Sequence, residues 1–79
     1  MRLDKYLKVS RLIKRRTVAN EACDGGRVMI NDKPAKASTT VKVGDVITIG
    51  FGNKEVKVEV LSVQETVRKE EAVELFKYL

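Results

Sequence analysis

The spacing of hydrophobic residues changes at Gly25-Gly26, and this change constrains the fold more than any other feature of the sequence. Before the two glycines, apolar residues recur at the three- and four-residue intervals of amphipathic helices; after them, they mostly alternate as in half-buried strands. Adjacent glycines readily end a helix, because glycine adopts the left-handed conformation found there. A chain of 79 residues also has room for one small domain at most. We therefore predict a single α+β domain over residues 1–79.

The first half predicts two short helices. The first spans residues 2–9 and has one apolar stripe, formed by Leu3, Tyr6 and Leu7. Thr17 is a suitable N-cap for the second helix, which we expect to end near Asp24. Its expected buried side consists of small or apolar residues: Val18, Ala19, Ala22 and Cys23. The segment between the helices is predicted to be a turn.

The second half predicts a small, mainly antiparallel sheet. A short strand at residues 27–30 is followed by a candidate turn at Asn31-Asp32, and Pro34 makes the returning segment either an edge strand or an irregular segment. Alternating apolar residues at 46–51 and 56–60 flank a turn at Gly52-Asn53, which predicts a hairpin with Phe51 on its apolar face. The C-terminal strand and helix are expected within residues 55–79, the helix running from about residue 68 to 79.

Basic residues concentrate in the first half of the chain. Residues 1–36 contain ten Lys and Arg against four Asp and Glu, whereas residues 37–79 contain six against seven. The first sixteen residues alone hold seven basic side chains and one acidic side chain. Such crowding of like charges costs stability unless a polyanion offsets it. The sequence therefore indicates a polyanionic partner, either nucleic acid or an anionic membrane surface.

Eight basic residues are candidates for contacting a nucleic acid: Arg2, Lys5, Lys8, Arg11, Lys14, Arg15, Arg16 and Arg27. The basic residues of the first predicted helix, Arg2, Lys5 and Lys8, lie opposite its apolar stripe at one-turn spacing. Arg15 and Arg16 are the first choices, because guanidinium groups bind phosphate bidentately and stack on bases. The lysines are better suited to positioning the protein on phosphates.

The sequence offers little catalytic or metal-binding chemistry. It contains no His and a single cysteine, Cys23, on the apolar side of the second predicted helix. A buried core thiol is therefore favoured over a nucleophile, which would have no His to activate it. Asp4 is interpreted as a helix-start or ion-pair residue that supports Lys8, because no second carboxylate has a place beside it. We expect no enzyme activity, no cofactor and no metal.

The sequence also bears on the compartment. One cysteine cannot form an internal disulfide, which fits a reducing environment. Charges interrupt the first sixteen residues every two or three positions, unlike a signal peptide. No apolar run approaches the roughly 20 residues that cross a bilayer. We predict a cytoplasmic protein that does not enter a membrane.

Several motifs, in unbroken order within residues 1–50, resemble the S4 RNA-binding domain family. They are Arg2-Leu3-Asp4-Lys5-Tyr6-Leu7, Arg11-Leu12, the small residues Ala19 and Ala22, Gly26-Arg27-Val28-Met29-Ile30-Asn31, and Gly44-Asp45-Val46-Ile47. The combination is specific, because all the motifs occur at compatible spacings. Asp32 departs from the pattern, since many members carry Gly there, but Asp also tolerates the turn conformation.

The resemblance implies that two N-terminal helices, the αL motif of that family, dock on structured RNA while the sheet serves as a platform. Over the whole chain, the sequence is similar to the single-domain S4 proteins of ribosome-associated quality control. That similarity implies binding to rRNA and peptidyl-tRNA on a stalled, split large ribosomal subunit. It further implies support of C-terminal alanine tailing by a partner protein, the alanine-tailing factor. We expect the protein to act as a monomer.

Alternative functions stand beside this one. S4 domains also occur in heat-shock proteins and in general rRNA-binding or ribosome-assembly proteins. They are further attached to RNA-modifying enzymes, but 79 residues leave no room for a catalytic domain. A basic amphipathic helix can instead bind a membrane surface. Here the helix spans about two turns and needs its three large apolar residues for the core.

Overall fold

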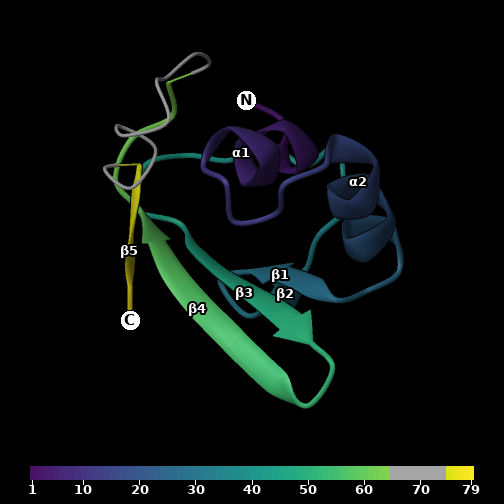
Figure 1. Ribbon diagram of the computed structural model, residues 1–79. Helices are drawn as coiled ribbons and strands as arrows, with labels where there is room; N and C mark the ends of the chain where they lie inside the picture. Colours follow the sequence, from purple (N-terminus) through teal and green to yellow (C-terminus); the bar gives the residue numbers. More distant parts are fainter. Residues whose placement is uncertain (65–74) are drawn as a thin grey trace.

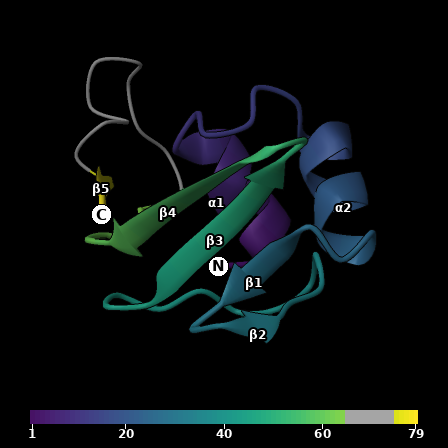
Figure 2. The same ribbon diagram turned by 90° about the horizontal axis from the view of Figure 1, so that it is seen from below.

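The computed structural model describes residues 1–64 and 75–79, in which two helices pack on a five-stranded sheet. The helices are α1 (Leu3–Val9) and α2 (Arg16–Asp24). The strands are β1 (Val28–Ile30), β2 (Lys33–Pro34), β3 (Val46–Phe51), β4 (Lys54–Val60) and β5 (Phe76–Tyr78). Both helices lie on one face of the sheet (Figure 1), and the opposite face is toward the viewer in Figure 2. The predicted α+β plan is confirmed.

The sheet has the strand order β2-β1-β3-β4-β5, and every neighbouring pair is antiparallel. The predicted hairpin is β3 with β4, paired from Val46↔Glu59 to Phe51↔Lys54. The turn between β1 and β2 has positive φ at Asn31 (52°) and Asp32 (65°). Two-residue hairpin turns of this kind require positive φ at both positions, which Asn and Asp tolerate. The departure at Asp32 therefore leaves the turn intact.

The core lies between the helices and the sheet. α1 buries the predicted stripe of Leu3, Tyr6 and Leu7, and the sheet adds fully buried aliphatic side chains: Val28, Ile47, Ile49, Val58 and Val60. α2 contributes the small side chains of Ala19, Ala22 and Cys23, which allow it to approach α1 closely. Gly26 has φ of 83°, as expected of a glycine that ends a helix. The two-glycine stop is confirmed.

Three local predictions are wrong. α2 begins at Arg16, with Arg15 at its N-cap and no side-chain capping hydrogen bond, so Thr17 lies inside the helix. Val18 is 44% exposed, because α2 contacts α1 through its small residues and Val18 lies beside that contact. Phe51 alternates with Ile47 and Ile49 as predicted, yet it is exposed at the end of the hairpin, beyond the area that the helices cover.

The predicted C-terminal helix is wrong where the structure describes it. Residues 65–74 lie outside the described residues, and Phe76–Tyr78 form strand β5 on the outer edge of β4. Phe76 and Tyr78 pair with Val60 and Val58, and their rings meet edge to face with centroids 5.2 Å apart. Aromatic residues favour strands, and an unpaired edge of β4 offers a row of backbone partners. Tertiary pairing therefore outweighs the helical spacing of this segment.

A buried hydrogen bond joins α1 to the start of β5. The Tyr6 hydroxyl donates to the backbone oxygen of Leu75 at 2.6 Å. The same oxygen accepts hydrogen bonds from the backbone N–H groups of Leu61 at 2.8 Å and Ser62 at 3.2 Å. Burial raises the pKa of Tyr6, which keeps this hydroxyl protonated as a donor. The bond fixes the C-terminal strand against the helical layer.

Candidate nucleic-acid interface

A buried carboxylate lies beneath the basic surface of the helices. Asp4 of α1 has a side chain only 3% exposed, and it accepts a hydrogen bond from the backbone N–H of Lys5 at 2.8 Å. Three further side chains donate to it from different positions in the chain: Arg2, Arg16 and Asn20. We call these four residues the Asp4 cluster.

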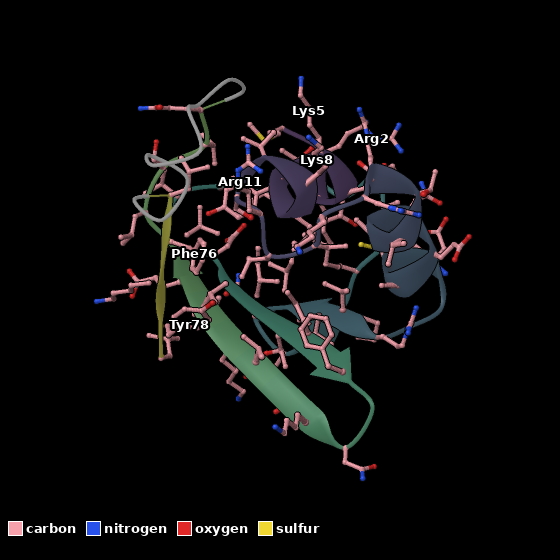
Figure 3. All side chains as sticks on the ribbon, viewed as in Figure 1. Arg2, Lys5, Lys8, Arg11, Phe76 and Tyr78 are labelled. Carbon is pink, nitrogen blue, oxygen red and sulfur yellow. The ribbon has the colours of Figure 1, made fainter. Side chains whose placement is uncertain are left out.

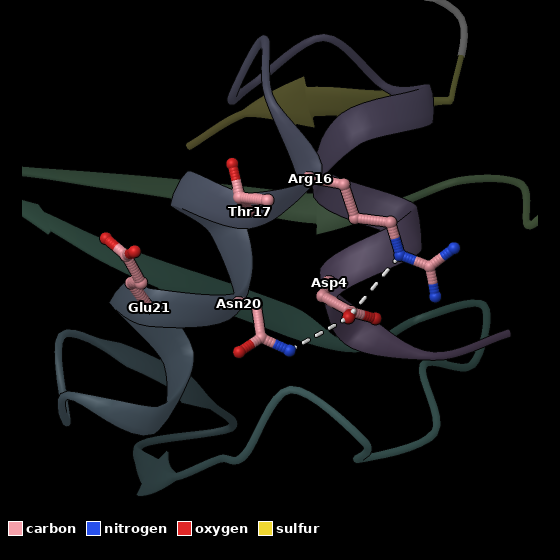
Figure 4. A pocket seen from close by; sticks show the side chains of 5 residues that line it. All are labelled: Asp4, Arg16, Thr17, Asn20 and Glu21. Carbon is pink, nitrogen blue, oxygen red and sulfur yellow. Dashed lines mark hydrogen bonds and ion pairs between the residues drawn. The ribbon is translucent and has the colours of Figure 1, made fainter.

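Two arginines converge on Asp4 from separate elements. The Nε of Arg2 lies 3.2 Å from Oδ1, and its Nη2 lies 3.4 Å from Oδ2. The Nε of Arg16, at the start of α2, lies 3.5 Å from Oδ2 (Figure 4). Both arginine side chains stay about half exposed, at 52% and 49%. The remaining N–H groups of each guanidinium can therefore bind a phosphate while Asp4 limits the freedom of the side chain.

The ionisation of Asp4 is governed by two opposing effects. Burial by itself raises the pKa of this carboxyl. Hydrogen bonds from Asn20, Arg2, Arg16 and the Lys5 backbone together outweigh it and hold the pKa below the ordinary value of 3.8. Asp4 is therefore a charged anchor at neutral pH. The expectation of an ion-pair residue is correct, but its partners are arginines 2 and 16 instead of the predicted Lys8.

The other predicted contacts of α1 lie on the same side of the molecule. Arg2, at the N-cap of α1, and Lys5 and Lys8 of α1 extend away from the sheet, and Arg11 extends from the following turn (Figure 3). Arg11 has φ of 64°, in the left-handed region that non-glycine residues adopt mainly in turns. The structure thus gathers these four predicted residues on the surface of the helical layer.

The start of α2 adds a second group of positive charge. Lys14 and Arg15 are exposed and directly precede Arg16. No side chain caps the N-terminus of α2, which leaves its first backbone N–H groups to solvent or to a ligand. The helix dipole favours an anion at this end. Phosphate groups passing the turn would therefore meet both side-chain and backbone donors.

Arg27 lies apart from the other predicted residues. It follows Gly25-Gly26 at the C-terminal end of α2, and its backbone is held by Ala22 and Gly50. The nine residues of α2 separate it from Arg16 by roughly 13 Å along the helix axis. Arg27 is exposed, but its distance places it at the margin of the interface.

Asn20 is a member of the site that the sequence did not single out. Its Nδ2 donates a hydrogen bond to Asp4 Oδ2 at 3.3 Å. Arg16 and Asn20 are four residues apart and so share one face of α2. That spacing was visible in the sequence, but the carboxylate that they share lies on another helix.

The cysteine has the properties of a core residue. Cys23 is buried. Burial, followed by the negative charges of Asp4 and Asp24, raises its pKa to about 11. A thiol that stays protonated at neutral pH is a poor nucleophile. The interpretation of Cys23 as a buried core thiol agrees with this environment.

Comparisons with known proteins place the chain in a family. Residues 1–47 match the S4 domain. The chain is 62% identical to the RQC P-site tRNA stabilizing factor of Halalkalibacterium halodurans, over 96% of this chain and 86% of the relative. It is 56% identical to the protein of the same name from Bacillus subtilis, over 100% of this chain and 92% of the relative.

Solved structures agree with the fold. The structure of Vibrio cholerae heat shock protein 15, described as trimeric, matches with a TM-score of 0.92 and 32% identity, covering 100% of this chain and 81% of that one. Within residues 1–64 and 75–79, neither helix is long and apolar enough to cross a membrane. The chain belongs to the S4 domain family and, within it, to the family of the RQC P-site tRNA stabilizing factors.

Proposed function

We propose that this protein is a non-enzymatic RNA-binding adaptor of ribosome-associated quality control. In this proposal it binds rRNA and peptidyl-tRNA on stalled large ribosomal subunits that have separated from the small subunit. Its role is to hold the tRNA in place while a partner factor adds alanine residues to the C-terminus of the nascent chain. Such a protein works in the cytoplasm, where ribosomes translate.

One observation carries the RNA-binding part of the proposal: the Asp4 cluster presents two half-exposed arginines side by side on the most basic segment of the chain. A guanidinium held by a buried carboxylate loses less side-chain entropy when it binds phosphate. The neighbouring lysines and the uncapped α2 N-terminus add contacts that depend on charge and shape. This combination suits folded RNA better than a small ligand.

The ribosomal part of the proposal is supported by the relatives. Two that match almost the full chain are named for RQC and for a P-site tRNA. We extend that role to this chain, together with the alanine-tailing factor as its protein partner. We also propose that it acts as a monomer, because helices and sheet of one chain bury their apolar faces against each other.

A second candidate function is general rRNA binding in heat-shock response or ribosome assembly. The fold match to Vibrio cholerae heat shock protein 15 favours this candidate. Identity is lower for that structure, at 32%, than for the factors named for the P-site tRNA, at 62% and 56%. We therefore place it second.

Crosslinking in living cells, followed by sequencing of the attached RNA, tests the proposal. We expect crosslinks to rRNA of the large subunit and to tRNA, increased when translation stalls. Crosslinks to small-subunit or precursor rRNA would favour the second candidate. A parallel liposome-pelleting assay provides the control: binding to anionic vesicles without binding to rRNA would contradict any RNA function.

A further inference from the structure

A shallow pocket lies beside the Asp4 cluster on the surface of the helical layer. Its volume is roughly 350 Å³, and five residues line it: Asp4, Arg16, Thr17, Asn20 and Glu21 (Figure 4). The volume falls in the range of small-molecule sites, about 300–1,000 Å³, and is sufficient for a purine ring. Four of the five lining residues come from the first turns of α2, next to the proposed phosphate contacts.

The orientation of the Asn20 amide is fixed by its neighbour. An ionised carboxylate can only accept hydrogen bonds, so the nitrogen of the amide must face Asp4, at 3.3 Å. The oxygen, Oδ1, consequently points away from Asp4 (Figure 4). Asp4 thereby turns Asn20 into a hydrogen-bond acceptor toward the pocket.

The pocket has acceptors on one side and a cation on the other. Asn20 Oδ1 and the exposed carboxylate of Glu21 are acceptors, whereas the half-exposed guanidinium of Arg16 is a donor. Glu21 repels phosphate, so a nucleotide would place its phosphate near Arg16 and its base near Asn20 and Glu21. The base that fits must present hydrogen-bond donors on its exposed edge.

Guanine meets this requirement best. Its Watson–Crick edge carries two adjacent donors, the ring N1–H and the exocyclic amino group, whereas adenine, cytosine and uracil each place acceptors beside a single donor group. RNA recognition commonly uses unpaired bases that are splayed out and bonded on this edge. We propose that the pocket binds an unpaired guanine base of the bound RNA, with Asn20 and Glu21 as specificity-determining residues; this inference rests on the proposed function.

Nucleotide titration of the isotope-labelled full chain by NMR tests the pocket directly. The probes are the monophosphates of guanosine, inosine, adenosine and uridine. We expect guanosine monophosphate to shift the backbone signals of Thr17, Asn20 and Glu21, with a dissociation constant on the order of 1 mM. Inosine lacks the exocyclic amino group and should bind at least about fivefold more weakly. Equal shifts by all four nucleotides, or shifts confined to the basic residues, would overturn the proposal.

A pair of matched variants separates base recognition from charge. Glu21→Gln and Glu55→Gln each remove one exposed carboxylate and raise the net charge equally, but Glu55 lies on β4, far along the chain from the pocket. We expect Glu21→Gln to reduce the preference for guanosine over adenosine monophosphate about fivefold or more, and Glu55→Gln to preserve it. An unchanged preference in Glu21→Gln, with stronger binding of every nucleotide, would mean that Glu21 only repels phosphate.

These outcomes are independent of the ribosomal proposal. If the protein prefers guanosine monophosphate but does not crosslink to rRNA, the guanine pocket is supported and the proposed function is contradicted. If the protein crosslinks to rRNA and tRNA but binds the four nucleotides equally, the proposed function is supported and the guanine pocket is contradicted.

Discussion

The ion pairs of the helical layer differ from those of the sheet in the burial of the carboxylate. In the helical layer, Asp4 is 3% exposed and is shared by two arginines. In the sheet, Lys57 approaches Asp32 at 4.0 Å and Lys77 approaches Glu59 at 3.5 Å, with carboxylates 82% and 35% exposed. Exposed pairs of this kind contribute about 0–1 kcal/mol to stability. The buried carboxylate can orient its partners, whereas the exposed ones mainly balance charge.

The helical layer and the sheet therefore contribute differently to the proposed RNA surface. The helical layer contains the most basic segment of the chain, with seven basic side chains and one acidic side chain in the first sixteen residues, and it holds two of its arginines in a defined geometry. The sheet supplies the apolar platform on which the helices rest. Net charge alone would not distinguish a specific RNA surface from a solvated basic helix. We propose that the buried carboxylate of Asp4, which orients Arg2 and Arg16, makes this surface specific for RNA.

The first prediction concerns the packing of α1 against the rest of the core. Leu7 is fully buried in α1, so Leu7→Ala should lower the free energy of unfolding by about 2–5 kcal/mol through lost transfer energy and the cavity left behind. Chemical denaturation measures this change. Val43→Ala is the control, because Val43 is exposed and its truncation should cost less than about 0.5 kcal/mol. Equal stability of the two variants would contradict the packing of α1 described above.

The second prediction compares the carboxylates of the two layers. Asp4→Asn keeps the shape of the side chain but removes the charge that both arginines share, and should cost about 2 kcal/mol of folding stability. Glu59→Gln makes the same chemical change in the sheet and should cost less than about 0.5 kcal/mol. Thermal or chemical unfolding of the two variants gives both values. Comparable losses would mean that burial does not distinguish the two ion pairs.

The third prediction concerns pH. Because the folded-state pKa of Asp4 lies below the ordinary value of 3.8, its contribution is complete above that value and is lost as pH falls through the lower, folded-state pKa. Denaturation curves between about pH 5 and pH 2 should therefore show a steeper loss of stability in the wild type than in Asp4→Asn. Parallel curves for the two proteins would show that Asp4 is not held in its charged form.

The fourth prediction is the smallest change in folding stability, and it concerns the hydrogen bond that joins the helical layer to the sheet. Tyr6→Phe removes the hydroxyl that bonds to Leu75, but the Leu75 oxygen keeps its backbone donors from Leu61 and Ser62. The loss should therefore be about 1 kcal/mol, without the added penalty of an unpaired buried carbonyl. Chemical denaturation monitors it, with Tyr78→Phe as the control on an exposed ring. A loss above about 3 kcal/mol would show that those two backbone bonds do not compensate.

In both layers, the features that depend on local spacing could be predicted from the sequence. α1 was predictable because Leu3, Tyr6 and Leu7 share one helical face, and α2 because Gly25-Gly26 ends it. The basic surface followed from the charge count. These features depend on residues close together in the chain, which is where spacing and propensity carry information.

The features that were missed depend on contacts between distant segments. The spacing of Leu75, Phe76 and Leu79 fits a helical stripe, but the edge of β4 draws Phe76–Tyr78 into the sheet. Asp4 and Asn20 are sixteen residues apart, and only the packing of α2 on α1 brings them together. Local spacing does not determine either outcome, because tertiary partners decide between conformations of similar local preference.

We propose that the geometry of the Asp4 cluster, and not net charge alone, creates the RNA surface. The most direct test compares two double variants that have equal net charge. For each, the affinity for large ribosomal subunits is measured at several salt concentrations. Arg2→Ala/Arg16→Ala removes both arginines of the cluster, and Lys33→Ala/Lys42→Ala removes two exposed lysines elsewhere. Thermal unfolding verifies that each variant is folded.

We expect the two double variants to differ clearly in their affinity for large ribosomal subunits. The wild type should show a log–log salt slope of roughly −3.5 to −4.5, for about five phosphate contacts. The arginine variant should bind at least about tenfold more weakly with a shallower slope, and the lysine variant should stay within about threefold of the wild type. Equal weakening of both folded variants would contradict a role for the geometry of the Asp4 cluster, because net charge alone would then explain the binding.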